Sequence, residues 1–190
     1  MHPVHDIEIP ADIEQFVPAV IEIPRGSHLK YEVDKPTGLL RLDRVLYSAV
    51  HYPANYGFIP RTHADDGDPL DVLVLMHEPV EPLTIVRARP LGGLRMVDRN
   101  EADDKIVAVM NGDAVYGQWR DIGDCQPAIL DRLRHYFLTY KDVPGPTQRR
   151  CEITDVYDRA EALAVIEHSR ADYRAEFGDL EKVATAARRR

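Results

Sequence analysis

Short apolar segments of strand length fill the first 110 positions of the chain. They lie at residues 17–23, 30–33, 39–45, 72–76, 84–90 and 105–110, and their pattern is typical of β-strands. Turn sequences separate them, including Lys-Pro-Thr-Gly at 35–38 and Leu-Gly-Gly at 91–93. This spacing favours a closed or strongly twisted antiparallel sheet.

Two helices are predicted to follow the strands. Apolar side chains recur at helical spacing over residues 128–140, and Pro127 suits a first helical turn. A second helix is predicted to begin at Asp158, because Asp158 and Glu161 resemble a capping box. One face of this helix carries apolar residues, namely Ala162, Ile166 and Tyr173. We therefore predict an α+β fold, a small closed barrel with flanking α-helices, in one domain over residues 1–190 with peripheral tails at 1–15 and 178–190.

Charged residues interrupt several of the predicted strands. Glu22 alternates with isoleucines, and Lys30, Glu32 and Asp34 share one face of their strand. A solvated sheet face is a sufficient explanation for these positions. Arg44 ends a face that otherwise carries leucines, which predicts a partly buried charge that needs a partner.

An acidic turn precedes the predicted strand at 72–76. Residues 65–71 read Asp-Asp-Gly-Asp-Pro-Leu-Asp, and crowded carboxylates repel one another unless a cation offsets them. Asp and Gly are also ordinary turn residues, so a solvated loop remains an alternative. An EF-hand is excluded, because its loop needs an oxygen ligand at position 5, Gly at position 6 and Glu at position 12, and counting from Asp66 these positions hold Leu70, Asp71 and His77.

A second acidic segment, Asp-Arg-Asn-Glu-Ala-Asp-Asp-Lys, occupies residues 98–105. Alone it is consistent with a charged hairpin loop. Both acidic segments flank predicted strands, so they are expected to meet at one barrel rim. Convergence of separate loops is what a multi-carboxylate metal site requires.

Composition limits the class of protein. The chain has 190 residues, of which 44% are hydrophobic and 29% charged, and this suits one globular domain. No apolar run approaches the ~20 residues of a membrane span, and the first residues lack the pattern of a signal peptide, so a cytoplasmic location without membrane contact is expected. Cys125 and Cys151 are expected to be plain thiols. The net charge of −8 argues against nucleic-acid binding, although Arg188, Arg189 and Arg190 form a basic tail.

Seven motifs in order resemble the signature of the family I soluble inorganic pyrophosphatases of bacterial type. They are Val-Ile-Glu-Ile-Pro, Lys-Tyr-Glu-Val-Asp, Leu-Asp-Arg-Val-Leu-Tyr, Tyr-Pro-Ala-Asn-Tyr-Gly-Phe-Ile-Pro, Asp-Gly-Asp-Pro-Leu-Asp-Val-Leu-Val-Leu, Met-Val-Asp-Arg-Asn-Glu-Ala-Asp-Asp-Lys and Tyr-Lys-Asp, within residues 16–142. The resemblance implies an OB-like five-stranded β-barrel, magnesium-dependent hydrolysis of pyrophosphate to two phosphates, and a homohexamer.

The resemblance also implies roles for individual residues. It implies that Asp66, Asp71 and Asp103 are ligands of the tightest metal site, with Asp71 shared with a second ion. Asp98 and Asp103 would hold a further magnesium, and Glu22 and Glu32 would complete the acidic lining. Asp68 corresponds to the general base beside the attacking water. Residues expected at the substrate are Lys30, Arg44, Tyr52, Tyr56, Lys105, Tyr140 and Lys141. The oxygen-only ligands select magnesium over zinc, and calcium is expected to bind but inhibit.

Charge arithmetic agrees with a need for cations. The seven proposed carboxylates and four basic residues leave a formal charge of −3, which three divalent ions would reverse. A phosphoesterase or nuclease and a noncatalytic calcium-binding module remain alternatives. The segment 143–150 departs from the family pattern, with Arg149 or Arg150 as candidate substitutes for a lysine, and the tail after Phe177 has no assigned counterpart.

Overall fold

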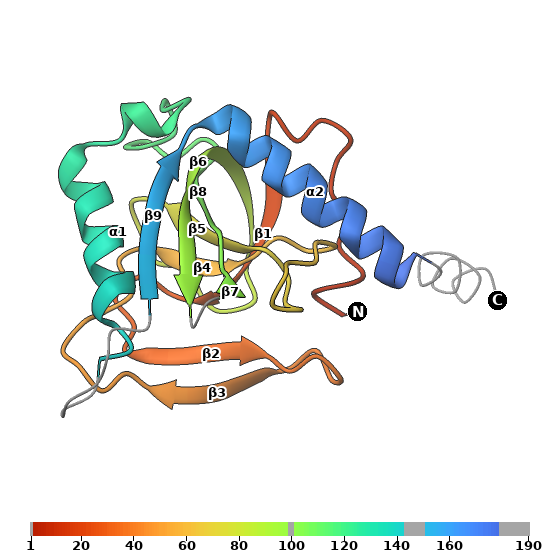
Figure 1. Ribbon diagram of the computed structural model, residues 1–190, viewed down its shortest axis with the longest axis horizontal. Helices are drawn as coiled ribbons and strands as arrows, with labels where there is room; N and C mark the ends of the chain where they lie inside the picture. Colours follow the sequence, from red (N-terminus) through yellow and green to blue (C-terminus); the bar gives the residue numbers. More distant parts are fainter. Residues whose placement is uncertain (1, 99–100, 143–150, 179–190) are drawn as a thin grey trace.

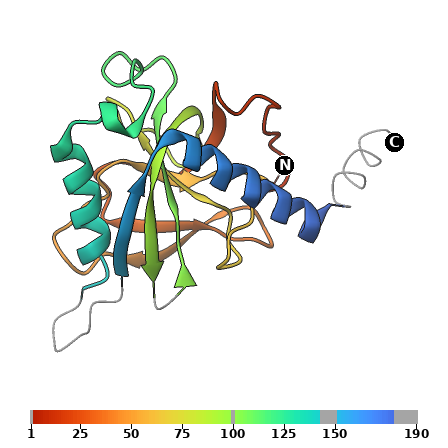
Figure 2. The same cartoon turned by 45° about the horizontal axis from the view of Figure 1, so that its top comes forward.

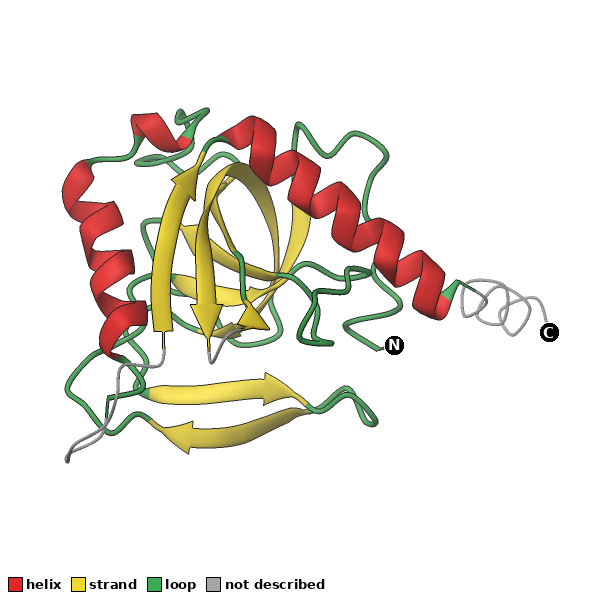
Figure 3. Ribbon diagram, in the orientation of Figure 1, coloured by secondary structure: helices red, strands yellow, loops and turns green. Residues whose placement is uncertain are grey.

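Five strands of the computed structural model close into a ring (Figures 1 and 3). The structure describes residues 2–98, 101–142 and 151–178. Within the ring each strand pairs with the next, and the last pairs with the first: β1 (Val17–Ile23), β4 (Asn55–Phe58), β5 (Asp71–Leu75), β8 (Lys105–Met110) and β6 (Ile85–Asp98). The predicted closed five-stranded OB-like barrel is therefore confirmed.

The remaining elements surround this ring. They are β2 (Leu29–Val33), β3 (Leu40–Val45), β7 (Glu101–Ala102), the 3₁₀ helix η1 (Ile122–Asp124), α1 (Pro127–Thr139), β9 (Cys151–Tyr157) and α2 (Arg159–Phe177). β7 and β9 pair with β6, while β2 and β3 form a separate hairpin beyond one end of the barrel (Figure 1).

The ring is not wholly antiparallel, although the strand pattern favoured an antiparallel sheet. β5 and β8 pair in parallel, with Asp71 opposite Lys105 at their first residues. The long β6 lies between them in the chain and allows this arrangement, because it returns the chain to the end of the barrel where β5 began. The acidic loop before β5 and the acidic segment before β8 consequently open at the same rim.

Strand β6 continues through the Leu-Gly-Gly sequence that was predicted to be a turn. The register shifts between Pro90 and Gly92, as in a β-bulge. A Cβ on Gly93 would lie 2.2 Å from the ring of Tyr157, and one on Gly92 would lie 2.4 Å from the carbonyl oxygen of Tyr157. These glycines allow β9 to approach β6 closely.

Strand β4 was not predicted, and its composition explains why. Asn55 is fully buried, with its side-chain oxygen accepting hydrogen bonds from the backbone N–H groups of Arg25 and Val80 at 3.1 and 3.2 Å. Gly57 lies against β1, where a Cβ would come within 1.8 Å of the carbonyl oxygen of Val20. Asn55 and Gly57 therefore interrupt the apolar pattern by which this strand would have been recognised in the sequence.

Both predicted helices are confirmed. α1 lies beside β9 and buries Leu133, while α2 packs against β6 and buries Ile166 (Figure 2). The Asp158 carboxylate accepts a hydrogen bond from the Glu161 N–H at 3.0 Å, as an N-cap should. The carboxylate of Glu161 pairs with Arg95 instead, so the expected capping box is replaced by a contact between α2 and the barrel.

The hairpin gives Arg44 the predicted charged partner but leaves its side chain more exposed than predicted. Its side chain is 52% exposed and its Nε donates to the Asp43 carboxylate at 2.7 Å. Leu42 on the same strand is itself half exposed, because β3 is the outer strand of a two-stranded sheet.

In the described part of the chain, we find no helix with the length and apolar character needed to span a membrane.

Candidate active site

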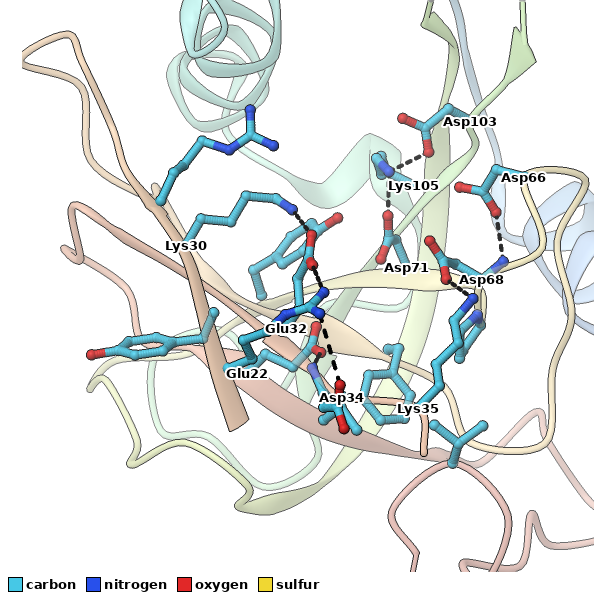
Figure 4. Close-up of a pocket in the computed structure, with 18 of the residues that line it drawn as sticks. Glu22, Lys30, Glu32, Asp34, Lys35, Asp66, Asp68, Asp71, Asp103 and Lys105 are labelled. Carbon is cyan, nitrogen blue, oxygen red and sulfur yellow. Dashed lines mark hydrogen bonds and ion pairs between the residues drawn. The ribbon is translucent and has the colours of Figure 1, made fainter. Parts of the chain in front are cut away.

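A cavity of about 620 Å³ lies between the hairpin and the open rim of the barrel. Figure 4 shows the charged side chains that project into it from β1, β2, the acidic loop and β8. The lining of the cavity contains all but one of the residues predicted for the site: Glu22, Lys30, Glu32, Arg44, Tyr56, Asp66, Asp68, Asp71, Asp98, Asp103, Lys105, Tyr140 and Lys141.

The exception is Tyr52, which was predicted to line the pocket. It is only 2% exposed and belongs to the apolar core, with its ring centroid 5.4 Å from that of Tyr56. Tyr52 therefore supports Tyr56 from behind and does not line the cavity.

Local hydrogen bonds shape the acidic loop. The Ala64 N–H donates to the Asp68 carbonyl at 2.8 Å, and the Asp68 N–H donates to the Asp66 carboxylate at 2.9 Å. Gly67 takes a left-handed conformation with φ of 80°, which favours glycine. The loop is thus a tight turn that holds two carboxylates at the mouth of the cavity.

Lys105 occupies the centre of the carboxylate cluster. It is 3% exposed, and its ammonium forms ion pairs with both Asp71 and Asp103 (Figure 4). Burial alone would lower the pKa of Lys105, but the two carboxylates raise it above its ordinary value. Burial also raises the pKa of Asp71, and the neighbouring Asp103 adds to this rise while Lys105 opposes it.

Glu22 is the most deeply buried acid at the barrel end of the cavity. Its carboxylate accepts a hydrogen bond from the Val33 N–H at 2.6 Å, which ties β1 to the hairpin. Burial raises the pKa of Glu22 to about 8, against the effect of this hydrogen bond, and the charge of Asp71 raises it further. Burial likewise raises the pKa of Asp66, against the effect of the hydrogen bond from the Asp68 N–H, and the charges of Asp71 and Asp68 raise it further. A nearby cation would stabilise the ionised form of both carboxylates.

The second acidic segment reaches the same cavity through Asp98 and Asp103. The Lys141 ammonium lies 2.5 Å from one Asp98 oxygen, and the Cys151 thiol donates to the other at 3.4 Å. Lys141 follows α1 in the chain, so this pair connects the helical side of the molecule to the end of β6. The predicted convergence of the two acidic segments is therefore observed.

The hairpin supplies basic side chains that were not predicted for the site. Arg41 contacts Glu32 at 3.2 Å and Asp34 at 3.8 Å, and Lys35 contacts Asp68 at 2.5 Å. The sequence predicted that Asp34 lies on the polar face of its strand. Lys35 and Arg41 were not predicted, because their only sequence signal is that they lie near the charged residues of the hairpin. The candidate residues Arg149 and Arg150 lie outside the described residues.

The donor set suits hard divalent cations. Among the described residues lining the cavity, eight are carboxylates and six are lysine or arginine, so the fully ionised lining has a formal charge of −2. The acidic donors are all oxygen atoms, as magnesium and calcium prefer. In the described ranges no three acidic, histidine or cysteine side chains are gathered as a metal site. Lys105 instead lies between Asp71 and Asp103, and Lys141 pairs with Asp98.

The closed barrel and its cavity of mixed acidic and basic side chains are typical of an enzyme that handles phosphate groups together with divalent cations. The chain belongs to the inorganic pyrophosphatase family, whose model matches residues 19–174. This agrees with the resemblance noted in the sequence.

Two groups of relatives support this membership. The chain is 52% identical over 140 residues to soluble inorganic pyrophosphatase 2 of Chlamydomonas reinhardtii and 54% identical over 140 residues to soluble inorganic pyrophosphatase of Oryza sativa subsp. japonica. Each match covers 74% of this chain, with 73% of the algal protein and 65% of the rice protein. The crystal structure of inorganic pyrophosphatase from Thermus thermophilus matches with a TM-score of 0.85 and 38% identity, over 90% of this chain and 99% of that one.

The raised pKa of Glu22 predicts a pH-dependent effect of Glu22→Gln in metal-free protein. The folded state holds the Glu22 proton more tightly than the unfolded chain, so this group's contribution to stability falls as the pH rises from about 4.5 to about 8. The glutamine of the variant does not titrate, so the variant does not lose stability in this way as the pH rises. Its free energy of unfolding relative to wild type should therefore increase by about 1 kcal/mol or more between pH 5 and pH 8, measured by urea unfolding in a chelator.

The exposed Glu176→Gln serves as the matched control and should follow wild type at both pH values. Added magnesium should reverse the advantage, because it stabilises the wild-type carboxylate more than the amide. A wild type and Glu22→Gln variant with parallel pH dependence in the chelator would contradict this account.

Proposed function

We propose that this protein is a magnesium-dependent inorganic pyrophosphatase that hydrolyses pyrophosphate to two phosphates in the cavity at the barrel rim. The observation that carries the proposal is the convergence of carboxylates and basic side chains from separate elements on one cavity. Family membership supports the same reaction.

The cavity alone is poorly suited to its substrate. When fully ionised, its lining has a formal charge of −2 and would repel a polyanion such as pyrophosphate. Bound magnesium ions would neutralise this charge, lower the pKa of a water molecule and offset charge on the transferring phosphoryl group. The carboxylates proposed to hold these ions are Glu22, Glu32, Asp66, Asp71, Asp98 and Asp103.

Asp68 is the proposed general base. Its side chain is 56% exposed at the cavity mouth, and its backbone is fixed by the hydrogen bonds of the acidic loop. In the reaction the water oxygen forms a new bond to one phosphorus, and the bond from that phosphorus to the bridging oxygen breaks. The leaving phosphate keeps the electron pair, and Asp68 accepts the water proton.

Basic and phenolic side chains are proposed to hold the phosphoryl oxygens. This set contains Lys30, Arg44, Tyr56, Lys105, Tyr140 and Lys141, all of which line the cavity. Burial raises the pKa values of Tyr56 and Tyr140 well above their ordinary range, so their hydroxyl groups stay protonated and can donate hydrogen bonds. Charged donors on several sides would also favour an in-line geometry.

We also propose that the protein acts in the cytoplasm and assembles as a homohexamer, without nucleic-acid or membrane partners. These proposals rest on the net charge and the family resemblance. A nuclease would need a basic and aromatic track for a strand, and a calcium-binding module would not need basic residues among its ligands.

The first test is phosphate release from pyrophosphate, ATP and bis(p-nitrophenyl) phosphate, each with magnesium, calcium or a chelator. We expect turnover of pyrophosphate with magnesium and little turnover of the other substrates. Calcium should compete with magnesium and inhibit, because its longer bonds of about 2.3–2.6 Å and irregular geometry activate water less well. Comparable turnover of all three substrates, or full activity with calcium alone, would contradict the proposal.

The second test separates the roles of two aspartates. Asp68→Asn should retain magnesium binding and lose about 10²–10⁴-fold in kcat, because it removes a base and keeps an oxygen at the same place. Asp71→Asn should weaken magnesium binding, because a buried ligand loses its charge. Calorimetric titration with magnesium and steady-state kinetics distinguish the two, and equal magnesium affinity with normal turnover in both variants would show that the roles are wrongly assigned.

A further inference from the structure

A lysine from the hairpin turn contacts the proposed general base across the mouth of the cavity. Lys35 Nζ lies 2.5 Å from Asp68 Oδ1 (Figure 4). It also donates to the Gly67 carbonyl oxygen at 3.0 Å. Lys35 belongs to the turn between β2 and β3, whereas Asp68 belongs to the loop between β4 and β5. The two contacts therefore connect elements on opposite sides of the cavity.

The backbone that carries Lys35 is held in place. The Gly38 N–H donates to the Asp34 carbonyl at 2.7 Å, and the Asp34 carboxylate accepts from the Thr37 hydroxyl at 2.6 Å. The His2 ring hydrogen-bonds to the Lys35 carbonyl oxygen at 2.8 Å. The turn is consequently an ordered support for the lysine side chain.

The same amino-terminal segment also holds the chain that leads into the acidic loop. The Arg61 N–H donates to the Val4 carbonyl and its Nε donates to the His5 carbonyl, both at 2.9 Å. Residues 2–5 thus contact the hairpin turn on one side and the start of the acidic loop on the other. This common support fixes the separation that Lys35 spans.

An isolated ion pair between exposed side chains contributes little to stability. Lys35 and Asp68 are 59% and 56% exposed, so a stabilising role is not a sufficient explanation for their contact. Their location favours an effect on geometry. One Asp68 oxygen is held by Lys35, while the other points toward the Asp71 side of the cavity (Figure 4).

We propose that Lys35 is a positioning residue that orients the Asp68 carboxylate for proton transfer. This inference rests on the proposed function, because it assumes that Asp68 is the general base. Lys35 acts through Asp68 and makes no contribution of its own to substrate binding. A misplacement of about 1 Å in a reacting group can cost up to about 10²-fold in rate, so loss of one anchor has a measurable effect.

The test is a double-mutant cycle of wild type, Lys35→Met, Asp68→Asn and the combined variant, assayed for magnesium-dependent pyrophosphate hydrolysis. Lys35→Met should lower kcat about 10-fold with a KM within about 3-fold of wild type. The same change should cause no further loss in the Asp68→Asn background. Lys35→Arg should restore part of the lost kcat, because it supplies a cation at the same position.

Arg134→Met is the matched control, since Arg134 forms an exposed ion pair with Asp131 at 3.7 Å on α1 and does not line the cavity. It should keep the wild-type kcat, and thermal melts should show that all variants are folded.

Inactive wild type would contradict the proposed function itself. With active wild type, three results would overturn the role of Lys35: an unchanged or increased kcat in Lys35→Met, a loss confined to KM, or losses that multiply independently with those of Asp68→Asn. An increased kcat would mean that Lys35 restrains the base and does not orient it.

Discussion

Mutual repulsion among the carboxylates at one end of the barrel is the constraint on which the site depends. Burial strengthens this repulsion and raises the pKa values of Glu22, Asp66 and Asp71. The folded chain offsets it with lysines from separate elements. Lys105 pairs with Asp71 and Asp103, Lys141 pairs with Asp98, and Lys35 pairs with Asp68. Lys105 and Lys141 also place positive charge around the space that a polyanionic substrate would enter.

The topology of the barrel makes this arrangement possible. Parallel pairing of β5 with β8 sets Asp71 beside Lys105 at the same rim, and the end of β6 brings Asp98 to it. The hairpin then closes the other side of the cavity, with Glu22 from β1 accepting a hydrogen bond from Val33 of β2. Each part contributes charge that would be poorly tolerated without its neighbours, so the site exists only when these elements are assembled.

Much of this arrangement could be predicted from sequence because acidic turns and strand boundaries are local signals. The acidic loop and the convergence of Asp98 with Asp71 were predicted for this reason, and both helices were predicted from the helical spacing of their apolar residues. Strand β4 was missed because Asn55 is buried through hydrogen bonds made by distant backbone groups. The burial of Arg44 was wrongly predicted because leucines on an outer hairpin strand can remain exposed. The contact of Lys35 with Asp68 carried no local signal, because its partner lies on another loop. Tyr52 was wrongly predicted to line the cavity. Its motif lies close to the site in the chain, but packing in the core places its ring behind that of Tyr56.

The central claim is that cations convert a repulsive cavity into a binding site for pyrophosphate. Calorimetric titration with imidodiphosphate, a nonhydrolysable analogue, measures this directly when it is done with magnesium and again in a chelator. The account predicts binding with magnesium and at least about 100-fold weaker binding in the chelator, because the lining then keeps its negative charge. Equal affinity under both conditions would contradict it.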